Sequence, residues 1–427
     1  KILYKMGKLK DISFYDYISK VDQLEEHKPY LHVICMLLVP VAGLTTLLPG
    51  VGTYSLALLA ATLAFNVIVY YRRKAKISIY FSVFSYLLRS LSFMEELSRL
   101  QVDEVSTYLA EIKGKVKQFK RFRRGAYLVV SKKISGSLED VILDYVRMIF
   151  HVDLIKFDFM VAELKTKKEE LTGLLELVGL LDSMIAVASF RAYLEGQYSL
   201  PILKEGSHQL LVDDIYHPLI KEPTKNSIQA KQSVLITGSN ASGKSTFIKT
   251  VAINAILSQT IFTSLSSRYE ADYFQIFSSM ALRDNLFSNE SYYVVEIKSL
   301  KRIYDQTSTK YPVLCFIDEV LRGTNTLERI AASSQILKQL TLRNALVFGA
   351  THDLELTNIL SDYYDNYHFE EQIEGNDIHF DYTLRAGRAV SRNAIKLLSM
   401  IGYSEDIIDK ATNEVNHFLL TNQWDKI

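Results

Sequence analysis

Cysteine, proline and tryptophan are scarce in this sequence of 427 residues, and neither sign of charge prevails. There are 2 Cys, 7 Pro and 1 Trp, and 49 Lys and Arg offset 48 Asp and Glu to leave a formal charge of +1. Cys35 and Cys315 stand far apart within apolar runs, which argues against a disulfide framework and a cysteine metal site. We therefore expect a reducing, cytoplasmic setting. With so small a net charge, any binding of a polyanion must depend on a local cluster of cations.

Changes in texture divide the chain into five segments. The first segment begins with Lys and is expected to be incomplete, the second is almost wholly apolar, and the third has the apolar periodicity of helices. The fourth alternates short apolar β-rich runs with helical stretches, as α/β domains do, and the last is helical. Their expected bounds are 1–28, 29–74, 75–205, 206–392 and 393–427.

Charged residues are absent from Pro29 to Tyr71, a run of 43 residues. A Pro-Gly turn divides it into segments 31–48 and 54–71, which as helices would each cover about 27 Å, close to the thickness of the hydrocarbon core of a bilayer. Two tyrosines and then Arg72, Arg73 and Lys74 close the second segment as an interfacial anchor would. We predict a transmembrane hairpin with both ends on the cytoplasmic side of the cell membrane. The alternative is a buried helical hairpin of a soluble core.

Cations gather between residues 113 and 133, where no acidic residue occurs. Such a run can contact the phosphates of DNA, or anionic lipid beside the hairpin, or be no more than a solvated face. It could position DNA without reading its sequence. The residues predicted to contact DNA are Lys113, Lys115, Lys117, Lys120, Arg121, Arg123 and Arg124.

The fourth segment carries a pattern that is typical of phosphate-binding loops. The apolar run Ser233–Thr237 leads into GSNASGKST and then into an apolar helical pattern, which places GxxxxGK[ST] between a strand and a helix. Lys244 would contact the β- and γ-phosphates of ATP, and Ser245 would bind Mg²⁺. The predicted nucleotide-binding residues are Gly238, Ser239, Asn240, Ala241, Ser242, Gly243, Lys244, Ser245 and Thr246.

Two further strands end in residues that suit ATP hydrolysis. The run 313–317 delivers Asp318, a second metal ligand, and Glu319, which is placed to polarise a water against the γ-phosphate. The run 345–349 ends near His352, which would lie on the same edge of a parallel sheet and contact the γ-phosphate. We predict a catalytic pair of Glu319 and His352.

These motifs together resemble the ATPase domain of the MutS mismatch-repair family. The family order is a GPNMGGKST-like loop, a DE-x-GRGTST-like segment and an ATH segment, and this chain has GSNASGKST, DEVLRGTNT and ATH in that order. Tyr216-His217-Pro218 resembles the RHP segment of the family, and Ser291–Glu296 resembles its STFMVE signature. The resemblance covers residues 206–420 well, and 75–200 loosely as core and lever helices.

The resemblance implies an α/β P-loop ATPase of ABC type, with a mostly parallel sheet and flanking helices, that uses ATP and Mg²⁺. It implies a homodimer in which Ser291 of the loop 288–291 completes the partner's site, Asn240 matches the loop asparagine of the family, and segment 393–427 is the dimerisation tail. The loop departs from the family at Ser239, Ala241 and Ser242, and the signature loop lacks the usual glycine. Phe93-Met94-Glu95 matches the mismatch-reading Phe-x-Glu only as letters, so we expect no mismatch reading.

Two functions remain open at this point. The first is a membrane-anchored MutS-like ATPase that drives a clamp around duplex or branched DNA. The second is a membrane-associated ABC-type mechanoenzyme that acts on a protein or lipid partner, with the basic run resting on anionic headgroups. A dimerisation module with little turnover is a third, against which Glu319 argues.

Overall fold

The computed structural model describes residues 30–48, 52–129, 138–239, 242–280, 292–322, 324–374, 377–389, 394–421 and 423–424. The chain forms two compact units, Lys1–Ala186 and Val187–Ile427. The fold therefore divides the chain between residues 186 and 187, and not after residues 74 and 205 as the sequence led us to expect.

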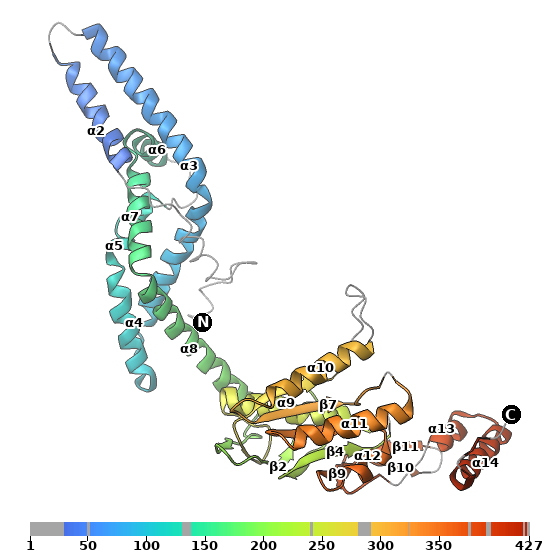
Figure 1. Ribbon diagram of the computed structural model, residues 1–427. Helices are drawn as coiled ribbons and strands as arrows, with labels where there is room; N and C mark the ends of the chain where they lie inside the picture. The colour runs from blue at the N-terminus through green and yellow to red at the C-terminus, as the bar shows by residue number, and fades with distance from the viewer. Residues whose placement is uncertain are drawn as a thin grey trace. The chain divides into compact units, whose positions relative to one another are not determined.

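The first unit is helical throughout its described residues (Figure 1). Helices α2 and α3 form a hairpin, and the later helices pack along the rest of α3. The α-helices are α2 (Tyr30–Thr45), α3 (Gly52–Leu97), α4 (Ser106–Gln118), α5 (Lys120–Arg123), α6 (Leu138–Phe150), α7 (Val152–Thr166) and α8 (Lys168–Tyr193), the last of which ends in the second unit.

Helix α3 is a single helix of 46 residues, longer than the sequence indicates. The segment expected at 54–71 is only its first part, and the expected boundary after residue 74 falls inside it. The helix continues because no proline or glycine interrupts residues 53–97. Its first and second parts share one core, since Tyr70 and Ile77 are both buried there. Helix α2 has 16 residues and ends before the expected residue 48.

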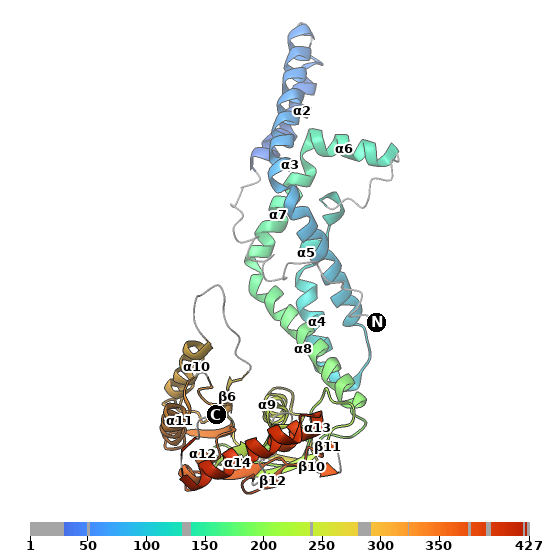
Figure 2. The same ribbon diagram turned by 90° about the vertical axis from the view of Figure 1, so that its right-hand side faces the viewer.

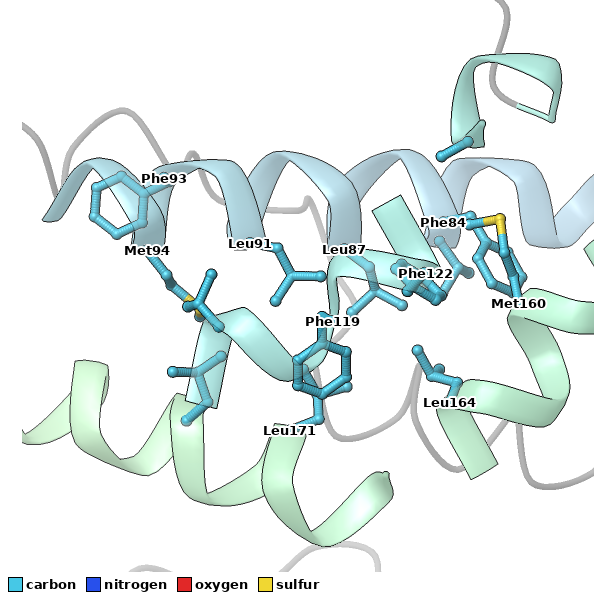
Figure 3. Packing of buried hydrophobic residues seen from close by; sticks show 14 of the residues in the cluster. Phe84, Leu87, Leu91, Phe93, Met94, Phe119, Phe122, Met160, Leu164 and Leu171 are labelled. Carbon is cyan, nitrogen blue, oxygen red and sulfur yellow. The ribbon is translucent and has the colours of Figure 1, made fainter. Parts of the chain in front are cut away.

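The core of this unit follows the second half of α3 (Figure 3). Phe84, Leu87 and Leu91 recur at helical spacing on one face and are at most 2% exposed. The ring of Phe84 lies 5.8 Å from that of Phe122 and 5.0 Å from that of Phe157, so α5 and α7 are both held against α3. Truncating such a buried side chain to alanine typically costs about 2–5 kcal/mol.

The second unit is built on a six-stranded sheet of order β12-β9-β4-β8-β7-β6. All neighbours are parallel except β12 and β9. The three strands that the sequence predicts are confirmed, and their uninterrupted apolar runs reflect burial on both faces. The strands are β4 (Ser233–Thr237), β6 (Gln275–Ser279), β7 (Val313–Asp318), β8 (Ala345–Ala350), β9 (Tyr364–His368) and β12 (Arg385–Ala386).

Alternate residues of β4 belong to two different cores, one on each face of the sheet. Val234 and Ile236 pack with Val251 of α9 (Lys244–Ile261), whereas Leu235 packs with residues of α10 (Tyr292–Gln306) and α11 (Thr326–Thr341). The sheet is therefore covered on both faces. The remaining elements are β1 (Ile202–Leu203), β2 (Leu210–Ile215), β3 (Asn226–Ala230), β5 (Arg268–Ala271), α12 (Leu354–Ile359), β10 (Glu371–Glu374), β11 (Asp377–Phe380), α13 (Ala394–Ile401) and α14 (Glu405–Thr421).

Candidate functional site

Three loops meet where the neighbouring parallel strands β4, β8 and β7 end. The backbone N–H of Glu319, after β7, donates to the carbonyl of Ala350 at 3.0 Å, and that of Thr351, after β8, donates to the carbonyl of Ile236 at 3.0 Å. The carboxyl ends of such strands are where open α/β sheets bind their ligands. The three sequence motifs are therefore on one edge of one sheet.

The loop after β4 requires glycine at Gly238. Its φ is 142°, and a Cβ atom there would lie 2.6 Å from the carbonyl oxygen of Phe369. No side chain fits at that distance. At the other end of the loop Gly243, with φ of 108°, precedes the first residue of α9, whose free N–H groups and helix dipole favour an anion. Asn240 and Ala241 lie outside the described residues.

Lys244 is a buried cation held by neutral groups. Its Nζ donates to the carbonyls of Gly238 at 2.8 Å and Ser239 at 2.7 Å, and the residue is only 5% exposed. Burial lowers the pKa of Lys244 to about 8, although Glu319 and nearby carboxylates oppose the shift. A buried ammonium between two carbonyls is well matched to an anion such as a phosphate.

The hydroxyl of Ser242 supports the same interpretation. Its Oγ is buried and has no hydrogen-bond partner among the residues that the structure describes. A buried hydroxyl without a hydrogen-bond partner is uncommon, and a bound ligand would provide that partner. With the glycine cradle and Lys244, the loop thus fits the phosphates of a nucleotide. Ser239 differs, because its hydroxyl donates to a carboxylate oxygen of Glu371 at 2.7 Å.

Glu319 and His352, the predicted catalytic pair, are in direct contact. Glu319 Oε1 lies 3.0 Å from His352 Nε2, and Glu319 Oε2 lies 2.8 Å from the Nε of Arg322. Burial and the charge of Lys244 lower the pKa of His352, and Glu319 opposes this only in part. The Nε2 atom of His352 is within hydrogen-bonding distance of the carboxylate.

A second ion pair fixes the segment that carries His352. The guanidinium of Arg329, on α11, donates to both carboxylate oxygens of Asp353, at 2.9 and 2.6 Å. Such a bidentate pair restricts orientation as well as position. Because Asp353 directly follows His352, α11 holds the imidazole in place.

Glu296 is a residue of the site whose role the sequence does not indicate. Its carboxylate is 2% exposed and accepts the backbone N–H groups of Leu321 and Arg322, just beyond Glu319. Burial raises its pKa, and the two N–H groups oppose that shift. A signal was present, because Glu296 stands at helical spacing before Leu300 and Ile303, on the buried face of α10.

Several of the predicted residues line one cavity of about 500 Å³. Residues 242–246, Glu319 and His352 all face it, whereas Gly238, Ser239 and Asp318 are not among its lining residues. Tyr216 of the segment that resembles RHP also faces it, together with side chains that the sequence did not single out, and several could accommodate a heterocycle or its sugar: Asn226, Phe247, Thr250, Phe369 and Tyr382. The volume is in the range of cavities that bind small molecules.

Ser245 and Asp318 are the predicted metal ligands. Asp318 ends β7 opposite Ala350 and contributes negative charge next to Lys244. Within the described residues no group of three or more His, Cys, Asp or Glu side chains could hold a metal. Mg²⁺ often takes only one or two protein ligands together with substrate phosphates and water, so one hydroxyl and one carboxylate suit it.

The cations predicted to contact DNA lie on α4, on α5 and directly after α5, and they differ in accessibility. Arg123 forms an ion pair with Glu95, and Lys115 lies 3.6 Å from Glu111. The fold thus brings carboxylates to a run that is free of them in sequence. The cations that remain exposed are Lys113, Lys117, Lys120, Arg121 and Arg124. Ser291, expected to act in the partner's site, lies outside the described residues.

Comparison with known proteins agrees with this arrangement of an α/β domain and a phosphate-type loop. Residues 234–419 match the family model of MutS domain V. The DNA mismatch repair protein MutS of Thermotoga petrophila is 28% identical over 265 residues, which are 60% of this chain and 33% of that protein. MutS of Aquifex pyrophilus is 30% identical over 246 residues, 55% of this chain and 28% of that protein.

The second unit of the chain therefore resembles MutS domain V. The MutS protein of Natronomonas pharaonis is similar to this chain as well, with 27% identity over 266 residues, 60% of this chain and 30% of that protein. The chain spans about a third of the length of the curated relatives that it matches. The resemblance seen in the motifs is thus confirmed for the family, and the mixed α/β fold suits its domain V.

Proposed function

We propose that this protein is a Mg²⁺-dependent ATPase of ABC type. The observation that carries the proposal is the convergence of Lys244, Glu319 and His352 on one cavity at the carboxyl edge of a parallel sheet. Each of these three side chains has hydrogen-bond or ion-pair partners that suit its proposed role. A protein that only stored nucleotide would not need the carboxylate of Glu319 to be oriented beside the phosphate-type loop.

Some residues of the chain bind the substrate, and others take part in proton transfer. ATP supplies the phosphoanhydride bond that is cleaved, and Mg²⁺ would supply positive charge beside it. Lys244 and the N–H groups of the loop hold the phosphates, and Ser245 and Asp318 hold the metal. Glu319 accepts the proton of the attacking water, and His352 keeps that carboxylate in position.

We propose in addition that two copies of the ATPase domain act as a homodimer. The support is the likeness of the signature stretch and the C-terminal helices to the MutS family, and the MutS domain V match extends through most of α14. In that arrangement Ser291 of one copy reaches the nucleotide of the other. Leu321, Arg322 and the residues that follow would lie near the dimer contact.

DNA is the proposed partner of the helical unit. The relatives are named DNA mismatch repair proteins, and four cations of α4 and α5 are exposed, as is Arg124 directly after α5. Such a local cluster of cations can contact the phosphates of DNA in a chain whose net charge is only +1.

The test is the rate of ATP hydrolysis by the full chain with and without duplex and branched DNA, at low and moderate salt. We expect stimulation by DNA that fades as salt rises. Turnover that ignores every DNA would refute the clamp and leave the ATPase intact. No turnover under any condition would refute the ATPase itself.

A second proposal is attachment to a membrane, with the ATPase on the cytoplasmic side. The specific observation is that Gly52–Ser78 of α3 is long and apolar enough to cross a bilayer and is 11% buried. Helix α8 passes the same test, but it contains Glu176 and Asp182 and packs one face into the helical core. On this basis the alternative function is a mechanoenzyme that acts on a protein or lipid partner at the membrane.

A further inference from the structure

Helix α6 has its apolar face outward. Val141, Ile142, Tyr145 and Val146 are 48%, 63%, 59% and 37% exposed, and their spacing places them on one side of the helix. Arg147, on the opposite side of the helix, is only 5% exposed. This is the reverse of the pattern that a surface helix of a soluble domain normally shows.

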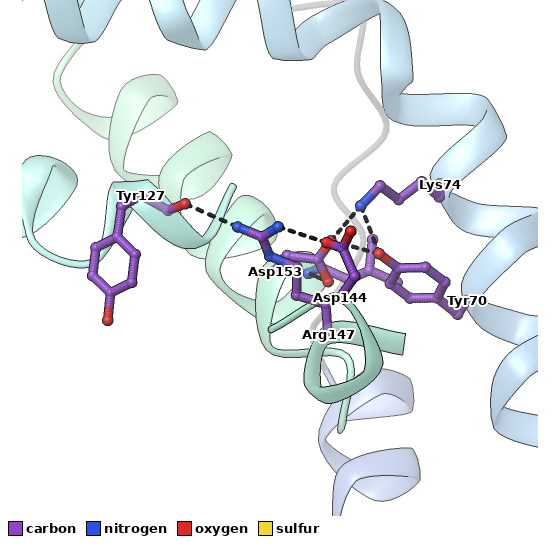
Figure 4. Close-up of polar contacts among 7 residues, drawn as sticks. Tyr70, Lys74, Tyr127, Asp144, Arg147 and Asp153 are labelled. Carbon is purple, nitrogen blue, oxygen red and sulfur yellow. Dashed lines mark hydrogen bonds and ion pairs between the residues drawn. The ribbon is translucent and has the colours of Figure 1, made fainter. Parts of the chain in front are cut away.

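The buried side chain of Arg147 fixes the orientation of α6 (Figure 4). Arg147 donates to Asp144 Oδ1 at 2.8 Å and to the carbonyl of Tyr127 at 3.1 Å. Tyr127 belongs to the short helical turn after α5, so the charged side of α6 faces the end of the unit where α4 and α5 pack. The apolar side faces away from these contacts.

The contacts also fix the level of α6 along α3. His151, which directly follows α6, places Nε2 3.0 Å from the carbonyl of Asn66. Two residues further on, Asp153 accepts hydrogen bonds from Tyr70 at 3.0 Å and from Lys74 at 2.8 Å. Helix α6 therefore meets α3 where its uncharged stretch ends, and it runs crosswise to the hairpin (Figure 2).

The hairpin beyond that level is apolar nearly all round. Between Gly52 and Tyr70 only Ser55, Asn66 and Tyr70 are buried, and they face α2 or its neighbours. The segment from Gly52 to Tyr71 covers roughly 30 Å as a helix, the thickness of a hydrocarbon core. A second protein chain would cover one stripe of such a helix, whereas lipid covers all of its sides. The occupant that fits is therefore a bilayer.

Aromatic and basic side chains gather at the same level. Tyr71 and Tyr145 are both 59% exposed, and Tyr30 at the start of α2 is 64% exposed. Arg72, which directly follows Tyr71, and Lys76, about one turn further along α3, are both exposed. Tyrosine and cations are the residues that membrane proteins place at the boundary between acyl chains and headgroups.

We propose that α6 lies flat in the headgroup region of the bilayer that the α2–α3 hairpin enters, with Ile142 and Tyr145 toward the acyl chains. The inference rests on the membrane attachment proposed above and adds a second, in-plane contact to it. An amphipathic helix of this kind lies with its apolar face in the boundary between headgroups and acyl chains. With the buried contacts of Asp153 it sets the depth of the hairpin.

The single tryptophan of the chain allows a direct test. In a Trp424→Phe background, a new tryptophan is placed in the full chain by Ile142→Trp on α6, Leu58→Trp on the hairpin, or Val102→Trp as the matched control. Val102 is 41% exposed and lies between α3 and α4. Each variant is reconstituted into vesicles of phosphatidylcholine and phosphatidylglycerol that contain lipid brominated near the headgroup or deep in the chain.

We expect quenching of the Ile142→Trp fluorescence by shallow bromine at least several-fold stronger than that of Val102→Trp, and quenching of Leu58→Trp by deep bromine. Quenching of Leu58→Trp without quenching of Ile142→Trp would overturn the in-plane helix and leave the hairpin proposal intact. Quenching of neither would overturn both. Tyr145→Trp, on the same face of α6, replaces Ile142→Trp if that variant does not fold, and the same outcomes decide.

Discussion

The carboxylate of Glu319 and the imidazole of His352 are 3.0 Å apart, although the residues come from the ends of two different strands. Glu319 has a φ of 59°, in the left-handed region that side chains other than glycine seldom adopt. The contact and the backbone conformation together turn the carboxylate toward the cavity that Lys244 lines. A base that is oriented before substrate binds needs no reorganisation when the reaction occurs.

Replacing Glu319 by glutamine should remove turnover and leave binding intact. The amide keeps the size of the side chain but cannot accept a proton, and a general base typically contributes about 10²–10⁴-fold to the rate. We expect a fall of that order in kcat with little change in the Kd for ATP. Glu355→Gln, on α12, is the matched control. Full activity of Glu319→Gln would show that another group is the base.

Affinity for ATP should decline above pH 8 because Lys244 loses its proton. Burial lowers the pKa of Lys244 to about 8, so the free protein holds a charged lysine below that pH and a neutral one above it. Only the charged form attracts phosphate. The KM for MgATP should rise with pH by up to about tenfold per unit beyond pH 8.

Lys244→Arg, which does not titrate in this range, should flatten the profile, and Lys244→Ala should abolish binding. A KM for the unaltered protein that stays constant to pH 9.5 or so would contradict the role.

Glu296→Gln should slow hydrolysis without weakening ATP binding. The carboxylate of Glu296 accepts two backbone N–H groups next to Glu319, and it steadies a turn in which Leu321 has a φ of 58°. Glutamine offers only one acceptor, so one N–H group is left buried without a partner, at a cost of about 1–3 kcal/mol. We expect kcat to fall about tenfold or more while KM stays within twofold, because the group acts on the base.

Glu328→Gln is the matched control for Glu296→Gln, because Glu328 is exposed at the start of α11. A purely structural role would lower the melting temperature of Glu296→Gln but leave kcat at a permissive temperature unchanged. That result would contradict a positioning role.

The site could be predicted well from sequence where its residues adjoin a strand end. A strand followed by a glycine-rich loop and a helix fixes the place of Lys244, and an apolar run fixes that of Asp318 and Glu319. The placement of Glu319 and His352 on one edge of the sheet followed from the rule that parallel strands end at one edge, whereas their direct contact did not. The roles of Glu296 and Arg329 did not follow, because each acts through contacts made by a helix distant in sequence.

The helical unit was less predictable. Apolar periodicity indicates that helices exist but not where one becomes the next, and α3 runs through the expected boundary at residue 74. The outward apolar face of α6 depends on what covers the helix, and apolar periodicity does not reveal that. The pairing of Arg123 with Glu95 joins residues that only the tertiary fold brings together. That pairing alters which cations are available to DNA.

Neutralising exposed cations should weaken DNA binding, whereas neutralising Arg123 should mainly reduce stability. Lys117→Gln, Lys120→Gln and Arg121→Gln together remove three exposed charges, and the slope of log K against log salt should fall by about one for each phosphate that the protein no longer binds. Arg123→Gln removes the hydrogen bond to Glu95, whose pKa Arg123 and Arg99 hold below its usual range. It should therefore change the salt slope little.

The measurement is DNA affinity by fluorescence anisotropy across a salt series, with thermal unfolding of each variant. An unaltered slope in the triple variant would refute the patch, and a slope change from Arg123→Gln alone would show that the ion pair opens to bind phosphate.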